Sequence, residues 1–361
     1  MFEINAWRMK NVAEPMNLEK ITLPKLNDNE VLVKVSGCGV CHTDLGFFYD
    51  GVKPVKEMPM TLGHEISGFI ESAGENAQEW LGKAVIVPAV MPCGECELCK
   101  KGRGTICRKQ QMPGNHVDGG FASHLVVPKT YLCEVDVKDD NEIFGDSGVT
   151  LKELSVIADA ITTPYQAVKN AGLVEGDLAI FVGVGGVGGY GVQIAKAFGA
   201  KVVAIDIDNR KLEKLKDFGA DLILNSKELD ERTIKKTIKE FVKESSANPF
   251  EWKIFETSGN PAGQNLAYSL LTFGATLSVV GFTMAKLELR LSNLMAYDAK
   301  AIGNWGCLPK YYSNVLELVK CGKIQLAPFV QTFPLSEINS VFERSHKHEI
   351  ENRPILIPDF N

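Results

Sequence analysis

A chain of 361 residues is too long for one ordinary hydrophobic core, so its length predicts about two domains. Its net charge of −6 argues against the broadly basic surface that nucleic-acid binding requires, and no apolar run approaches the roughly 20 residues of a membrane span. The first residues show no charged-then-apolar leader, so we expect a cytoplasmic protein that binds neither nucleic acid nor membrane.

Residues 1–160 have the pattern of a small, irregular β-barrel. Apolar residues alternate between Val31 and Val35, as in a strand, and 66–71 and 84–90 predict further strands. Glycines and prolines interrupt the whole segment, which is typical of short strands joined by turns. We therefore expect a β-rich first domain.

Four of the nine cysteines lie close together in this domain, at Cys93, Cys96, Cys99 and Cys107. Intervals of two residues let neighbouring thiolates meet at one ion, and the longer loop brings the fourth to complete a tetrahedron. Four sulfur ligands leave no open coordination position, so we predict a structural zinc. Two disulfides or an iron–sulfur cluster are the alternatives.

Two short stretches carry further side chains of the metal-binding type. They are Cys41-His42-Thr43-Asp44 and Gly63-His64-Glu65. Taken alone, such a cysteine or histidine is more often a core residue satisfied by its neighbours. The residues by themselves leave both interpretations open.

From about residue 162 the pattern changes to alternating strands and helices, which is typical of βαβ units and a parallel sheet covered on both faces. The predicted strands are 178–183, 201–206, 221–224, 252–256 and 275–280, and the predicted helices lie near 187–198, 209–218, 228–244 and 261–272. The fold class is therefore α/β, with a doubly wound Rossmann domain over 161–300. The last segment, 301–361, ends in an apparent strand at 353–357 and should return to the first domain.

A glycine pattern, G-x-G-x-x-G, joins the first of these strands to the helix after it. Its glycines permit a tight turn, close approach of a pyrophosphate and close packing of helix on strand. The next strand ends in Asp206, at the spacing of a carboxylate that accepts hydrogen bonds from an adenosine ribose and repels a 2′-phosphate, which favours NAD over NADP. The candidate cofactor residues here are Gly183, Gly185, Gly186, Val187, Gly188, Asp206 and Lys211. A glycine turn without a ligand is the alternative.

In combination, these motifs resemble the zinc-dependent medium-chain dehydrogenase/reductase superfamily of the alcohol dehydrogenase type. The resemblance covers essentially the whole chain. It implies a GroES-like catalytic domain into which the Rossmann domain is inserted, with NAD and two zinc ions per chain. It assigns a catalytic zinc to Cys41 and His64, with Asp159 at a third position where many relatives have cysteine.

The same resemblance implies roles for the neighbours of these ligands. Thr43 corresponds to a catalytic hydroxyl that carries the proton away, and Glu65 to an acid that supports the metal and can approach it. His42 corresponds to a basic residue that faces the cofactor pyrophosphate. Many relatives end the proton relay in a histidine at the position of Gly46, so we expect the relay to end on ribose hydroxyls and water or on another donor.

Within the superfamily, the pattern most resembles the 6-hydroxycyclohex-1-ene-1-carbonyl-CoA dehydrogenases of anaerobic aromatic degradation. Asp159, Gly46, the stretch 303–307 and the tyrosine pair at 311–312 suggest this. The resemblance implies a secondary alcohol as substrate, with an acyl-CoA thioester as one option, and a homo-oligomer, either a dimer or a tetramer. The alternatives are a dehydrogenase of a small alcohol, aldehyde or polyol, and a non-catalytic NAD-binding protein.

Overall fold

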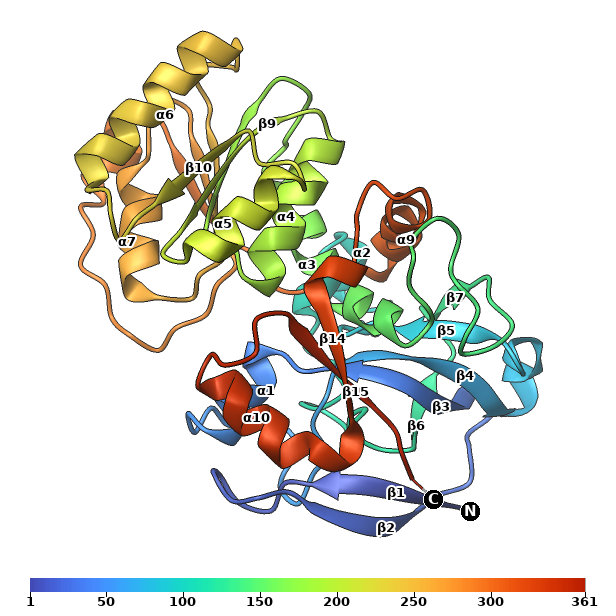
Figure 1. Cartoon of the computed structure of the whole chain (residues 1–361). Helices are drawn as coiled ribbons and strands as arrows, with labels where there is room; N and C mark the ends of the chain where they lie inside the picture. Colours follow the sequence, from blue (N-terminus) through green and yellow to red (C-terminus); the bar gives the residue numbers. More distant parts are fainter. Residues whose placement is uncertain (361) are drawn as a thin grey trace. The chain divides into compact units, whose positions relative to one another are not determined.

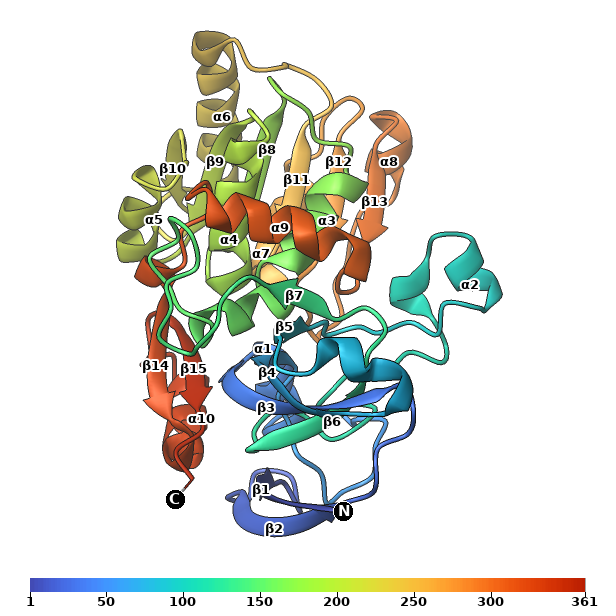
Figure 2. The ribbon, with the colours of Figure 1, turned by 90° about the vertical axis from the view of Figure 1, so that its right-hand side faces the viewer.

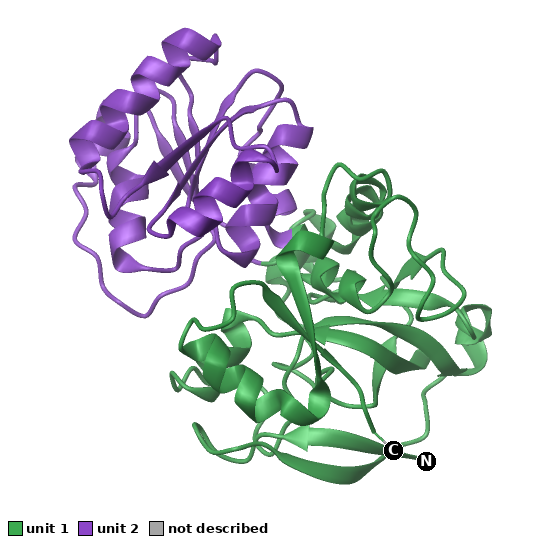
Figure 3. Cartoon of the chain, viewed as in Figure 1, with its two compact units in different colours: residues 1–162, 306–361 green, residues 163–305 purple. Residues whose placement is uncertain are grey.

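The computed structural model describes residues 1–360, and the chain divides into two compact units (Figure 3). Unit 1 contains residues 1–162 and 306–361, and unit 2 contains residues 163–305. Both the beginning and the end of the chain therefore belong to unit 1, and unit 2 is an insertion between them.

The elements are labelled in Figures 1 and 2. The strands are β1 (Phe2–Arg8), β2 (Asn17–Leu23), β3 (Glu30–Gly39), β4 (Glu65–Ala73), β5 (Ala84–Val87), β6 (His124–Pro128), β7 (Cys133–Val135), β8 (Leu178–Val182), β9 (Lys201–Asp206), β10 (Leu222–Asn225), β11 (Lys253–Glu256), β12 (Thr276–Val279), β13 (Lys300–Gly303), β14 (Val330–Pro334) and β15 (Arg353–Ile357). The α-helices are α1 (His42–Phe48), α2 (Glu97–Lys100), α3 (Thr162–Asn170), α4 (Gly186–Ala197), α5 (Asn209–Lys216), α6 (Glu231–Ser245), α7 (Pro261–Ser269), α8 (Ser292–Ala296), α9 (Tyr312–Lys320) and α10 (Ile338–His346). The short 3-10 helices are η1 (Glu75–Trp80), η2 (Gly104–Ile106), η3 (Glu153–Ala158), η4 (Pro309–Tyr311), η5 (Ala327–Phe329) and η6 (Leu335–Glu337).

Unit 1 is built on a seven-stranded sheet with the order β14-β15-β3-β4-β5-β7, in which β6 also pairs with β3. Strand β3 is the centre of this unit. On one face its valines at 31, 33 and 35 are buried in the main core, as their alternation predicts. Strand β15 runs antiparallel to the end of β3, with Leu356 opposite Cys38. The tail of the chain therefore completes the sheet of the first segment.

Unit 2 is a six-stranded parallel sheet with the order β10-β9-β8-β11-β12-β13. Numbered within the unit, this order is 3-2-1-4-5-6, which is that of the Rossmann fold. The predicted α/β class and doubly wound sheet are confirmed. Strand β13 was not predicted, because its four residues are mostly exposed and lack an apolar run.

Both faces of this sheet are covered by helices, as Figures 1 and 2 show. Ile180 packs in one core with Ile238 of α6 and Ala267 of α7. The next residue, Phe181, points to the other face, where a Cβ placed on Gly191 of α4 would lie 2.3 Å from its ring. Successive side chains of this fully buried strand therefore pack against helices on opposite faces of the sheet.

The helices of unit 2 begin where side chains satisfy their first amide groups. Asp208 accepts a hydrogen bond from the amide of Arg210 at the start of α5, and Asp230 accepts one from Thr233 at the start of α6. None of the helices within residues 1–360 combines the length and the apolar character that a membrane crossing needs.

Candidate catalytic zinc centre and cofactor loop

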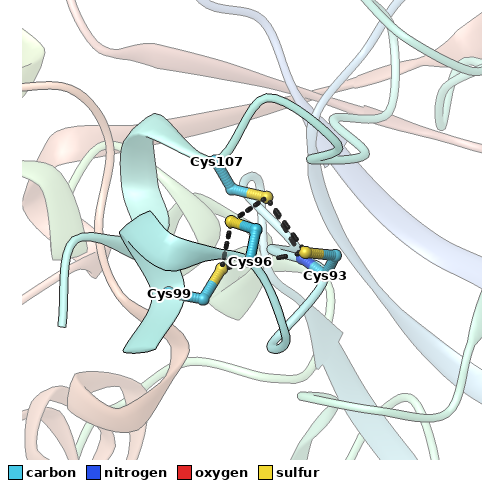
Figure 4. Close-up of side chains that lie close together, drawn as sticks. All are labelled: Cys93, Cys96, Cys99 and Cys107. Carbon is cyan, nitrogen blue, oxygen red and sulfur yellow. Dashed lines mark hydrogen bonds between the residues drawn. The ribbon is translucent and has the colours of Figure 1, made fainter. Parts of the chain in front are cut away.

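The side chains of Cys93, Cys96, Cys99 and Cys107 face one another around a common centre (Figure 4). The Sγ–Sγ distances are 3.4 Å between Cys96 and Cys99, 3.5 Å between Cys93 and Cys107, 3.7 Å between Cys96 and Cys107, and 3.9 Å between Cys93 and Cys99. Sulfur atoms that share one tetrahedral zinc at its usual bond length lie about 3.8 Å apart, whereas a disulfide bond is about 2.05 Å long. The cluster therefore fits one zinc ion and not two disulfides.

The backbone around this cluster prepares it for a cation. Hydrogen bonds from the amides of Glu95 and Cys96 lower the pKa of Cys93 to about 6. Desolvation beside the other thiols instead raises the pKa of Cys99 to about 12. Neighbouring thiols resist ionising together, so all four become thiolates only with a cation between them. The chemistry of the donor set agrees with its geometry.

A second group of metal-binding side chains gathers at Cys41, His64, Glu65 and Asp159, whose donor atoms all lie within 4.8 Å of one another. Oδ2 of Asp159 lies 3.7 Å from Sγ of Cys41 and 3.6 Å from Nε2 of His64. For zinc ligands at usual bond lengths, such donor pairs lie about 3.3–3.5 Å apart. The residues present thus fit a zinc ion, with small adjustments.

Three separate elements bring these ligands together. Cys41 follows β3 and precedes the first turn of α1, His64 immediately precedes β4, and Asp159 follows η3. The histidine side chain is 1% exposed, whereas that of Asp159 is 17% exposed. The second cluster is therefore partly accessible on the side of the aspartate.

The surroundings of His64 favour a positive charge at this centre. Burial alone lowers its pKa, but the nearby carboxylates of Asp44 and Asp159 and the side chain of Cys41 together raise it well above the usual value. Neither ring nitrogen has a hydrogen-bond partner among the described residues, although both are buried. Nδ1 lies 3.4 Å from Oδ1 of Asp44, which leaves Nε2 to face the cluster.

Glu65 is held by other partners. Its carboxylate accepts hydrogen bonds from Nε of Arg353 at 3.0 Å and from the amide of Ala160 at 2.9 Å. Burial raises the pKa of Glu65, and the Arg353 guanidinium opposes this rise. Glu65 therefore lies within reach of the metal centre as one half of a buried ion pair.

The glycine loop after β8 has the geometry that its pattern predicts. Gly183 has a φ of +88°, and a Cβ on Gly188 would lie 2.0 Å from the carbonyl oxygen of Gly183. A Cβ on Gly185 would meet nothing within 4 Å, and this residue caps α4. Open space in front of a helix N-terminus, where Gly186 and Val187 form the first turn, is what a pyrophosphate requires.

Asp206 ends β9 beside this loop. Its carboxylate accepts hydrogen bonds from the amides of Val184 at 2.7 Å and Ile207 at 2.8 Å. These bonds fix its orientation at the carboxyl edge of the sheet, where Rossmann domains bind their ligands. Lys211 lies in the first turn of α5, close enough to lower the pKa of Asp208, which a hydrogen bond from Arg210 lowers most.

Comparison with known proteins agrees with the description of both the metal clusters and the cofactor loop. Residues 27–137 match the family described as "Alcohol dehydrogenase GroES-like domain", and residues 186–320 match "Zinc-binding dehydrogenase". An alcohol dehydrogenase of Geobacillus stearothermophilus is 32% identical over 349 residues, which are 96% of this chain and 97% of that protein. The chain belongs to the zinc-dependent medium-chain alcohol dehydrogenase superfamily.

Solved structures of this superfamily share the fold. Galactitol-1-phosphate dehydrogenase from Escherichia coli is 26% identical with a TM-score of 0.87, covering 98% of this chain and 100% of that one. The alcohol dehydrogenase of Aeropyrum pernix is 29% identical with a TM-score of 0.83, again covering 98% and 100%. The predicted superfamily and enzyme class are confirmed, and so is the GroES-like class of the first domain.

The remaining predicted residues of this dehydrogenase lie near the second cluster in different ways. Oγ1 of Thr43 is 3.8 Å from Sγ of Cys41. His42 is exposed and stacks on His348, with ring centroids 6.1 Å apart. Gly46 lies within α1, where a Cβ would meet only ordinary contacts.

Sequence patterns missed three residues that organise the dehydrogenase's sites. Asp44 is fully buried and accepts hydrogen bonds from the amides of Cys41 at 2.9 Å and Gly63 at 3.0 Å, which ties together two stretches that carry metal ligands. Arg353 reaches Glu65 across 288 residues of sequence. Glu256, at the end of β11, accepts hydrogen bonds from the amides of the turn that follows. Only Asp44 had a local signal, its position three residues after Cys41.

Proposed function

We propose that this dehydrogenase transfers a hydride between a secondary alcohol and NAD, with a catalytic zinc held by Cys41, His64 and Asp159. The observation that carries the proposal is the contrast in accessibility within this cluster, since two ligands are buried and the third is partly exposed. Such an arrangement fits three protein ligands and one open position, the pattern of catalytic rather than structural zinc.

When bound, zinc supplies Lewis-acid chemistry, which lowers the pKa of an alcohol and polarises a carbonyl. The residues of the chain have separate tasks around it. Asp44 orients His64 so that Nε2 faces the cluster, and the ion pair of Glu65 with Arg353 supplies a fixed, nearly neutral wall. We assign the first step of proton removal to the Thr43 hydroxyl. With Gly46 in α1, water or the cofactor ribose receives that proton next.

For the cofactor, the open space at Gly185 and the N-terminus of α4 support pyrophosphate binding, and Asp206 supports a ribose with free hydroxyls. His42 and Lys211 are the candidates for contacts with its phosphate and ribose groups, and desolvation together with the Arg353 guanidinium lowers the pKa of His42, so this residue would donate as a neutral imidazole. In this proposal residues 161–300 are the NAD-binding domain, and 1–160 and 301–361 form the catalytic domain with its four-cysteine zinc lobe. A cytoplasmic location and a dimeric or tetrameric assembly are predictions of the same kind.

The finer proposal is oxidation of 6-hydroxycyclohex-1-ene-1-carbonyl-CoA to its 6-oxo product. Asp159 as a ligand, Gly46 in α1 and the stretch 303–307 with Tyr311 and Tyr312 are the features that support it. The second candidate substrate is a small alcohol, an aldehyde or a polyol. It is favoured by the relatives at 32% and 33% identity, both of which are named alcohol dehydrogenase.

The test measures NAD reduction by the zinc-loaded enzyme against free secondary alcohols, polyols and hydroxyacyl-CoA thioesters at matched concentrations. A kcat/KM for the cyclic hydroxyacyl-CoA at least 100-fold above that for the best free alcohol is expected from the finer proposal. The reverse ranking would select the second candidate. No turnover of any alcohol by protein that holds both zinc ions and binds NAD would refute the catalytic proposal.

A further inference from the structure

A cavity of about 660 Å³ lies in unit 1 and contains none of the residues assigned above to metal or cofactor. It is formed where β1, β2, β3 and β6 meet the segment before η3 and the end of the chain. Its volume is within the range of small-molecule sites, which is about 300–1,000 Å³. The catalytic proposal leaves this cavity without a role.

Three cations line this cavity and come from three different segments. They are Lys20 on β2, Lys34 on β3 and Lys152, which directly precedes η3. No carboxylate within residues 1–360 lies at ion-pair distance from any of the three. The cavity therefore holds three lysines without ion-pair partners and two lining carboxylates, Glu3 and Asp140, which leaves an excess of positive charge.

One buried polar atom in the same cavity is unsatisfied, and a second polar group, the hydroxyl of Ser36, makes no hydrogen bond with any described residue but keeps some contact with solvent. Oδ1 of Asp140 is buried without a partner in the described part of the chain. Buried polar atoms are almost always hydrogen-bonded, so Oδ1 of Asp140 points to a partner from outside the chain. Asp140 needs a donor, whereas the lysines need an acceptor.

We propose that this cavity binds a small phosphorylated polyol. Its phosphate is placed between Lys34 and Lys152, and a hydroxyl of the same molecule donates to Asp140. A simple anion meets the lysines but leaves the carboxylate unsatisfied and repelled, because Glu3 and Asp140 also line the cavity. A molecule that carries both groups meets both requirements. The same phosphate also accepts a hydrogen bond from Ser36.

The cavity borders two elements whose following residues belong to the metal cluster of Cys41, His64 and Asp159. Strand β3 continues to Cys41, and η3 continues to Asp159. The two elements touch beside the cavity, where a Cβ on Gly37 would lie 2.4 Å from the carbonyl oxygen of Lys152. An occupant that bridges Lys34 and Lys152 therefore links both elements. A ligand that binds the folded chain and not the unfolded chain raises the thermal midpoint of the protein. This shift provides a readout that is independent of activity.

The test is isothermal titration of the full-length, zinc-loaded protein with glycerol 3-phosphate, with inorganic phosphate and glycerol as separate arms, at fixed ionic strength and with NAD present. We expect saturable binding of glycerol 3-phosphate, at least five-fold tighter than that of phosphate, and no binding of glycerol. The double variant Lys34→Gln/Lys152→Gln should weaken binding by at least ten-fold and abolish the rise in thermal midpoint.

Lys25→Gln is the matched control, because Lys25 is exposed in the same unit and does not line the cavity. Asp140→Asn should reduce the preference for glycerol 3-phosphate over phosphate. An absence of saturable binding up to 20 mM would overturn the proposal, and so would equal binding by the double variant and the control. Binding seen only when NAD is left out would place the anion at the glycine loop and also overturn it.

Discussion

The two cysteine-containing clusters of unit 1 contrast in how the chain encodes them. The four-cysteine cluster comes from one short stretch, 93–107, and its donors are all sulfur. The cluster at Cys41, His64 and Asp159 joins three elements that lie up to 118 residues apart, and its donors are sulfur, nitrogen and oxygen. The first can form as soon as its lobe folds, whereas the second exists only when the sheet of unit 1 is complete. A local cluster thus suits a structural ion, and a dispersed one suits a site that must stay open.

The largest expected effect comes from breaking the local cluster. Cys107→Ser removes one thiolate and should release the zinc of the lobe, since structural zinc sites contribute on the order of 10 kcal/mol to folding. We expect a loss of one zinc per chain with aggregation or a sharp fall in thermal midpoint, measured by elemental analysis and calorimetry. Cys321→Ser is the control, because Cys321 is free and exposed. A stable, soluble Cys107→Ser protein would show that the lobe needs no metal.

Chelation should separate the two sites. Native protein is expected to hold about two zinc ions, and a chelator should first remove the one with three protein ligands and an open coordination position, at the Asp159 cluster. Activity should then fall to background while the far-ultraviolet circular dichroism stays unchanged. Re-addition of zinc should restore the activity. One zinc or none in freshly purified, active protein would contradict the two-site description.

Sequence reasoning reached the local features more easily than the dispersed ones. The spacing of the four cysteines and of Gly183, Gly185 and Gly188 carries their geometry within a few residues. The third ligand position, by contrast, came from a family resemblance, because no local pattern links residue 159 to Cys41. Arg353 was missed as a partner of Glu65 for the same reason, since 288 residues separate them. Strand β13 was missed because its pairing with β12 and not its own sequence makes it a strand.

A sharper test of the dispersed cluster is to change its exposed ligand. Asp159→Asn replaces a carboxylate by a neutral amide, which is a poor zinc ligand, and should lower both zinc retention and kcat. Loss of supporting contacts alone costs about 10–100-fold in zinc sites, so we expect at least about 100-fold here. Asp159→Cys should keep the metal but change the pH profile of turnover. If Asp159→Asn retained zinc and full activity, Glu65 would become the favoured third ligand, released from Arg353.

The smallest effect is expected from a change in the cofactor loop, outside both metal clusters. Such a variant also shows how the protein behaves when both zinc sites are intact. Asp206→Ala should weaken NAD binding by about 10–100-fold, the range for losing a hydrogen bond to a charged group, and should leave both zinc ions in place. It also removes a charge that repels a 2′-phosphate. NADP binding should improve only modestly, because the nearby Arg210 is engaged by Asp208, with Nη2 3.0 Å from Oδ2.

Asp206→Ala/Asp208→Ala also removes the ion pair between Arg210 and Asp208 and should bind NADP more tightly than the single variant, as measured by quenching of protein fluorescence. Zinc content serves as the internal control, since no residue of either metal cluster belongs to this loop. Equal affinity of the unmodified protein for NAD and NADP would remove Asp206 as the determinant. Loss of zinc from the variants would instead mean that the cofactor loop and the metal clusters depend on one another for folding.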